Sequence, residues 1–166
     1  MTTTEEHQLA EQLGDAVWRM FRRSLHIRTI DTGSCAACES EIRLLSAPHY
    51  DLHRLGFFFT PAPRHADLLM VTGPALRAMD IALLKTYHAM PEPKVVMVVG
   101  ACALGGVYPR DEFANGSVDT VLPVDVSVPG CPPSPLALLH GLMVAVGRLS
   151  EKVSDMTFVD DPDELR

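Results

Sequence analysis

The stretch Lys94–Val99, with the sequence KVVMVV, decides the fold of this chain. It is an almost unbroken apolar run that stops at Gly100. Such a run is typical of a strand that is buried on both faces, as the strands of a parallel sheet are. A second run of this kind, Asp67–Thr72 (DLLMVT), precedes it and ends at Gly73. The two runs predict a parallel sheet that is covered by helices on both sides.

Outward from these two strands, strands and helices alternate along the chain. Further strands are expected at His26–Asp31, Leu52–Thr60 and Thr120–Val128, the second of them near a sheet edge. Helical spacing of apolar residues predicts helices at residues 5–24, Glu39–Leu45, Leu76–Met90 and Pro135–Leu149. Alternation of this kind implies right-handed βαβ units. The predicted fold is therefore α/β, a three-layer flavodoxin-like domain with a mostly parallel sheet.

Length and composition favour one folded domain. The chain has 166 residues, of which 47% are hydrophobic and 21% charged. We expect an amphipathic N-terminal helix at residues 1–24, the α/β domain at 25–150, and an acidic tail at 151–166. A net charge of −7 argues against a nucleic-acid partner, because phosphate binding needs clustered basic residues. The sequence shows neither an export signal nor a run of about 18 apolar residues, so a cytoplasmic location is expected.

The four cysteines all follow predicted strands. Cys35 and Cys38 come after His26–Asp31, Cys102 comes after Lys94–Val99, and Cys131 comes after the strand that ends at Val128. In open α/β sheets, ligands bind beyond the carboxyl ends of the strands. A parallel sheet would bring these three loops to one edge, so we expect the four thiols to converge.

Four thiolates match the coordination of a 4Fe–4S cluster, in which each iron takes one sulfur from the protein. Without an export signal, the reducing cytosol favours metal-binding or redox-active thiols over disulfides. Three alternatives remain at this stage. The cysteines could be small buried apolar residues, they could bind a structural zinc, although zinc sites usually carry paired knuckles, or Cys35 and Cys38 could form a thioredoxin-like dithiol.

With these segments identified, the chain resembles the small, cluster-bearing subunit shared by group 4 nickel–iron hydrogenases and respiratory complex I. The resemblance runs from about Leu25 to Leu149. It is carried by GSCAACESE (Gly33–Glu41), PRHAD (Pro63–Asp67), VTGP (Val71–Pro74), VGACALGG (Val99–Gly106) and PVDVSVPGCPPSP (Pro123–Pro135). The resemblance implies that Cys35, Cys38, Cys102 and Cys131 bind one 4Fe–4S cluster.

The same resemblance implies a role in an oxidoreductase complex. The chain would pass electrons to or from the nickel–iron site of a separate hydrogenase large subunit, and would hold no complete active site itself. Further partners would be a ferredoxin-like iron–sulfur subunit and membrane subunits, which would place the chain on the cytoplasmic side of the inner membrane. Formate-hydrogenlyase-type hydrogenases are the favoured branch, because two alanines separate Cys35 from Cys38.

Two other functions stay open from the sequence. Complex I subunits of this type carry two adjacent cysteines at the first site, and that branch would reduce a quinone with the same cluster. A zinc-binding structural scaffold is the alternative from another class. Glu41 occupies an acidic position three residues after the second ligand. It is a candidate for a proton path or a subunit interface, but a carboxylate in a first helical turn is also favoured by the helix dipole alone.

Overall fold

The computed structural model describes residues 2–108 and 110–155 and contains a five-stranded parallel sheet. The strand order is β2-β1-β3-β4-β5, which is the order of flavodoxin-like folds. The predicted α/β fold class is thus confirmed. The strands are β1 (Leu25–Asp31), β2 (Phe57–Phe59), β3 (Leu68–Thr72), β4 (Val95–Val99) and β5 (Val126–Val128). The α-helices are α1 (Thr2–Phe21), α2 (Ala37–Leu44), α3 (Asp80–Ala89) and α4 (Pro135–Asp155).

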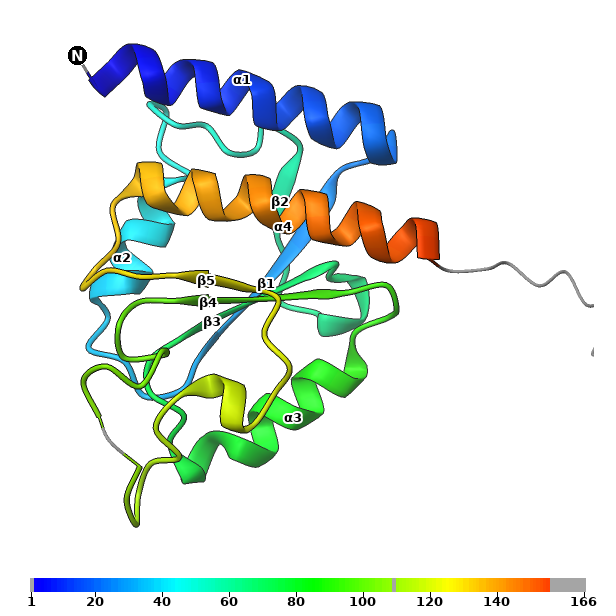
Figure 1. The fold of residues 1–166 in the computed structure, drawn as a ribbon. Coiled ribbons are helices and arrows are strands. Elements are labelled where there is room, and N and C mark those ends of the chain that lie inside the picture. Colours follow the sequence, from blue (N-terminus) through cyan, green and yellow to red (C-terminus); the bar gives the residue numbers. More distant parts are fainter. Residues whose placement is uncertain (1, 109, 156–166) are drawn as a thin grey trace, which may run out of the picture.

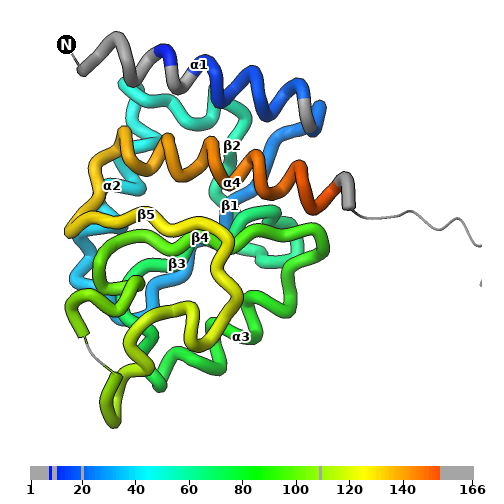
Figure 2. The backbone as a smooth tube through the Cα atoms, in the orientation of Figure 1, coloured from blue at the N-terminus to red at the C-terminus, as the bar shows by residue number. Residues whose placement is uncertain are grey.

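Helices cover both faces of the sheet, and one helix forms an additional outer layer. α4 lies on one face and α3 on the other, while α1 runs alongside α4 on the side away from the sheet (Figure 1). The backbone trace shows the same stacking, with α2 at the end of the sheet where β5 leads into α4 (Figure 2). Among the described residues, no helix is both long and apolar enough to cross a lipid bilayer.

The side chains of β3 and β4 alternate between two hydrophobic cores. Met70 and Met97 point toward the core shared with α1 and α4, whereas Val71 and Val98 point toward the core shared with α3. Every residue of β3 and β4 is buried. This is the environment expected for the uninterrupted apolar runs of the sequence, because a central parallel strand has no face in water.

Several element boundaries differ from the sequence-based expectation. The strand expected at Thr120–Val128 is only β5, because Val118–Thr120 forms a 3₁₀ turn and Pro123 cannot donate a ladder hydrogen bond. The strand expected at Leu52–Thr60 is only β2, which does lie at a sheet edge as predicted. α4 continues past the expected end near Leu149 to Asp155, and residues 156–166 of the expected tail lie outside the described residues.

A glycine allows α4 to approach the sheet closely. A Cβ atom at Gly141 would overlap Val128 Cγ2 and lie 3.3 Å from Met97 Sδ. By contrast, a Cβ atom at Gly147, further along the same helix, would meet no atom within 4 Å. The missing side chain at Gly141 therefore sets the distance between α4 and the strands β4 and β5 that lead to two of the cysteines.

We expect opposite effects from alanine at these two glycines. Gly141→Ala should lower the free energy of unfolding by about 1–3 kcal/mol, because the added methyl group overpacks the core. Gly147→Ala should raise it by about 0.5–1 kcal/mol, because glycine weakens a helix interior. Urea unfolding of the purified chain measures both values. Equal effects of the two substitutions would show that α4 does not depend on a close approach at Gly141.

Candidate functional site

The loops that carry the four cysteines lie at the carboxyl edge of the sheet. Cys35 lies in the loop after β1, and Cys38 lies in the first turn of α2. Cys102 follows β4, and Cys131 follows β5. Since β1, β4 and β5 belong to one parallel sheet, these loops leave it in the same direction. The structure thus brings together the three segments that the sequence predicts to converge.

The loop of Cys35 is fixed by short polar side chains. Asp31 Oδ1 accepts hydrogen bonds from the backbone N–H of Gly33 at 2.8 Å and of Ser34 at 2.6 Å. Ser34 Oγ in turn accepts a bond from the N–H of Ala36 at 3.0 Å. Turns of this kind favour Asp and Ser because their side chains replace backbone partners. They direct the chain from β1 into α2 with Cys35 exposed and Cys38 buried.

Backbone hydrogen bonds join the loops of Cys102 and Cys131. The N–H of Gly100 donates to Val128 O at 2.9 Å, and the N–H of Ala101 donates to Gly130 O at 2.7 Å. These bonds continue the pairing of β4 with β5 beyond the end of the strands. Cys102 and Cys131 therefore follow directly from two segments that are held side by side.

Gly100 is the point at which the Cys38 thiol meets these two loops. A Cβ atom at this position would lie 2.6 Å from Cys38 Sγ and 3.7 Å from Gly130 O. The backbone of Gly100 also has a φ of 95°, which L side chains rarely adopt. Both observations require glycine here. The missing side chain also lets the turn after β4 lie close to the sulfur of Cys38 at the start of α2.

The thiols influence one another electrostatically. The pKa of Cys38 is raised from 9.0 to about 11, first by burial and then by the charges of Glu39 and of the other three cysteines. The pKa of Cys102 is also raised, first by burial and then by the charges of Cys131 and Cys35. Such mutual effects require the four groups to lie near one another. All four are free thiols.

The described side chains include no ready-made site for a single metal ion. Within residues 2–108 and 110–155, no three His, Cys, Asp or Glu side chains are placed so that they could hold one metal ion. The four cysteines differ in exposure: Cys38 is buried, Cys102 is half-buried, and Cys35 and Cys131 are exposed. The exposed pair marks the side of the group that faces out of the chain.

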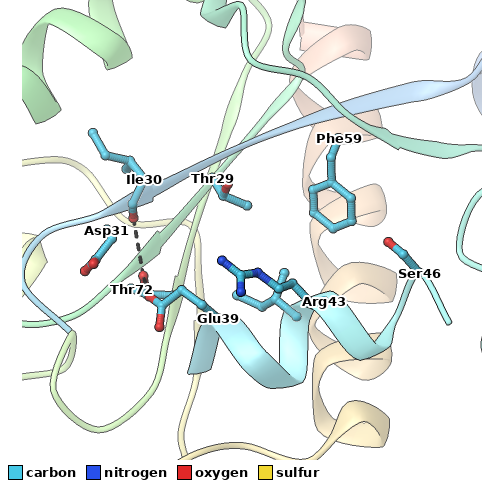
Figure 3. A pocket seen from close by; sticks show the side chains of 9 residues that line it. Thr29, Ile30, Asp31, Glu39, Arg43, Ser46, Phe59 and Thr72 are labelled. Carbon is cyan, nitrogen blue, oxygen red and sulfur yellow. Dashed lines mark hydrogen bonds between the residues drawn. The ribbon is translucent and has the colours of Figure 1, made fainter. Parts of the chain in front are cut away.

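An open groove lies beside the cysteine loops, between α2 and the end of β1 (Figure 3). Its volume is about 340 Å³. Its walls are formed by residues of β1, β2, β3 and the segment around α2: Thr29, Ile30, Asp31, Glu39, Ile42, Arg43, Ser46, Phe59 and Thr72. The groove is not suggested by the sequence, because it depends on how short β2 is.

The acidic residues of α2 are placed differently from one another. Glu41, the residue named from the sequence, is half-buried and does not line the groove. Glu39, which was not named, does line it and accepts a hydrogen bond from Thr72 Oγ1. One weak signal points to Glu39 in the sequence, which is its position directly after Cys38 in a first helical turn.

Comparison with known families assigns the chain. The sequence profile of the family described as NADH ubiquinone oxidoreductase, 20 kDa subunit, matches residues 35–145, a segment that begins at the first cysteine and includes all four. The chain belongs to this family. The resemblance noted from the cysteine segments is thereby confirmed, and so is the expectation of a subunit of an oxidoreductase.

Individual relatives agree with this assignment. The chain is 38% identical to the probable membrane-bound hydrogenase subunit mbhJ of Pyrococcus furiosus over 154 residues, which are 92% of each chain. It is 39% identical to formate hydrogenlyase subunit 7 of Escherichia coli over 136 residues, which are 81% of this chain and 53% of that protein.

A solved structure is similar as well. It is a chain of the membrane-bound sulfane sulfur reductase, an archaeal respiratory membrane complex. The TM-score is 0.69 at 28% identity, and the match covers 92% of this chain and 85% of the other. The likeness therefore extends over nearly the whole α/β fold.

The cysteines should differ in reactivity in the reduced chain without bound metal. At about pH 8, a rise of two pKa units lowers the thiolate fraction about a hundredfold. Iodoacetamide should accordingly modify Cys38 about a hundredfold more slowly than a thiol with the ordinary pKa of 9.0, and more slowly than the exposed Cys35 and Cys131. The rate at Cys38 should keep rising as the pH approaches 11. Peptide mass spectrometry follows each site, and equal rates at all four would contradict the burial described above.

Proposed function

We propose that Cys35, Cys38, Cys102 and Cys131 bind one 4Fe–4S cluster, through which this chain transfers electrons as a subunit of a hydrogenase-type complex. The proposal rests on the meeting of three cysteine loops at one edge of the sheet. Gly100, which has no side chain, lies there between Cys38 Sγ and the loop of Cys131. Soft thiolate ligands suit iron–sulfur clusters and zinc, and four are present.

The arrangement fits a cluster better than a single zinc ion. Structural zinc sites usually carry paired C-x-x-C or C/H knuckles, whereas Cys35 and Cys38 form the one C-x-x-C pair of this sequence. In a cubane, each thiolate binds a different iron, so that the sulfurs stay apart. A zinc-binding scaffold therefore has less support, as do a dithiol made of Cys35 and Cys38 alone and four structural cysteines.

Each part of the chain would have a separate task around the cluster, which when bound would supply a one-electron carrier. Cys38 would anchor it from inside the protein, since this thiol is buried. Cys35 and Cys131 would hold the outward side, from which electrons would pass to a partner subunit. The backbone N–H of Cys102 would stabilise the thiolate of the same residue, and hydrogen bonds to the sulfurs of a cluster tune its potential.

The hydrogenase branch is favoured by two observations. Two alanines separate Cys35 from Cys38, and two relatives are named as subunits of a membrane-bound hydrogenase and of formate hydrogenlyase. The partners would then be a nickel–iron large subunit, a ferredoxin-like iron–sulfur subunit and membrane subunits. These would hold the chain at the cytoplasmic face of the inner membrane. Glu41 would serve in a proton path or at the interface with the large subunit.

A quinone-reducing complex is the second candidate, because the family is named after a subunit of NADH ubiquinone oxidoreductase. Metal analysis of the purified complex separates the two. A hydrogenase should contain nickel in proportion to this chain, together with hydrogen-dependent reduction of a dye. A complex that has no nickel and reduces a quinone would overturn the hydrogenase assignment and leave the cluster assignment intact.

Removal of one ligand should disrupt the cluster. Purified under anaerobic conditions, the native chain should contain about four iron and four sulfide, with the electron paramagnetic resonance of a reduced 4Fe–4S cluster. Cys102→Ala should lose most of this signal and the electron transfer of the complex, because one iron loses its thiolate. A Cys102→Ala variant with a full-strength signal would contradict the ligand assignment.

Substitution at Gly100 should have a similar effect with all four ligands retained. Gly100→Ala would place a methyl group against Cys38 Sγ and should lower the iron content per chain. Gly147→Ala is the matched control, since that position is open, and it should keep the native iron content. Full cluster occupancy in Gly100→Ala would show that Cys38 does not depend on the space beside Gly100.

A further inference from the structure

The groove beside α2 exposes an unpaired part of β1. β2 pairs only with Leu25, His26 and Ile27, and the last hydrogen bond between the two segments runs from Thr60 N–H to Ile27 O at 2.9 Å. Parallel strands bond to each neighbour through alternate residues. The backbone groups of Thr29 and Asp31 therefore point toward the side where β2 has already ended.

Within the described chain, no segment pairs with β1 on this side beyond Ile27. The opposite edge of β1 is fully occupied, since β3 pairs with it from Ile27 to Asp31. An open edge of this kind is a template for another strand, and proteins usually cover it. Strand addition is a common way for an extended peptide to bind.

The groove also holds a carboxylate oxygen that lacks a partner. Glu39 Oε1 accepts a hydrogen bond from Thr72 Oγ1. Its other oxygen, Oε2, is buried without a hydrogen-bond partner among the described residues. Arg43 lines the same groove one turn further along α2, but it is exposed and makes no ion pair with Glu39. A buried carboxylate oxygen without a partner is costly, so a cation or donor is expected there.

Apolar side chains complete the groove. Ile30, Ile42 and Phe59 line it together with the polar groups (Figure 3). This combination suits a peptide better than a free ion, because a peptide supplies backbone hydrogen bonds for β1, apolar contacts for the walls and a charged side chain for Glu39.

We propose that this groove binds an extended segment of a partner subunit, which pairs with β1 at Thr29–Asp31 and places a basic side chain against Glu39. The inference rests on the proposed function only in that the chain works within a complex. It does not depend on the cluster or on which branch of the family is correct.

Amide hydrogen exchange in the purified complex tests the strand pairing. If a partner segment is present, the amides of Thr29 and Asp31 should exchange as slowly as those of Arg28 and Ile30, which face β3. Fast exchange at Thr29 and Asp31, with Arg28 and Ile30 protected, would overturn the proposal.

Two variants, purified with the complex through a tag on this chain, test the contacts. Thr29→Pro removes an N–H that the chain itself does not use, and Glu39→Gln removes the negative charge. Each should lower the amount of co-purifying partner subunit by about tenfold or more, whereas the matched controls Thr29→Val and Glu11→Gln should not. Full recovery of the partner with both Thr29→Pro and Glu39→Gln would overturn the proposal.

The remaining outcomes are also decisive. A small organic molecule that is bound in the native complex and lost in Glu39→Gln, while all subunits stay, would assign the groove to that molecule and overturn the proposal. If Thr29→Pro fails to fold, the exchange measurement and Glu39→Gln decide. Absence of iron from the native complex would overturn the proposed function and leave these readouts unaffected.

Discussion

The common direction of β1, β4 and β5 is the constraint on which the candidate site depends. Their carboxyl ends lie at one edge of the sheet, so that loops distant in the sequence leave it together. The buried runs of β3 and β4 fix this direction, because strands without a face in water require helices on both sides and hence crossover connections. The position of the thiols is thus a consequence of how the hydrophobic core is built.

Close packing at the end of the strands refines that placement. Gly141 lets α4 approach β4 and β5, and Gly100 lets the turn after β4 approach the sulfur of Cys38. The contact at Gly141 belongs to the hydrophobic core and the contact at Gly100 belongs to the candidate site. Both contacts depend on the missing side chain of a glycine. Two hydrogen bonds from Gly100 and Ala101 then hold the Cys102 and Cys131 loops together. The geometry of the four thiols therefore follows from backbone contacts as much as from the cysteines.

The sequence was sufficient for the fold and for the meeting of the cysteine loops at one sheet edge, because each depends on a strong local signal. Apolar runs revealed β3 and β4, and the position of each cysteine after a strand predicted that the loops would meet. Thr120–Val128 was misjudged because its β-branched residues suit a strand, while the turn at Val118–Thr120 depends on packing beneath β4. Glu39 was missed since its importance comes from Thr72 and the early end of β2, which no local pattern encodes.

The central claim is that four thiols from three strand-end loops bind one cluster. Anomalous diffraction at the iron edge, from anaerobically grown crystals of the complex, tests it most directly. One compact group of iron sites is expected at the carboxyl edge of the sheet, in bonding contact with the sulfurs of Cys35, Cys38, Cys102 and Cys131. A single metal ion, or iron bound to only some of these sulfurs and to a residue outside the set, would contradict it.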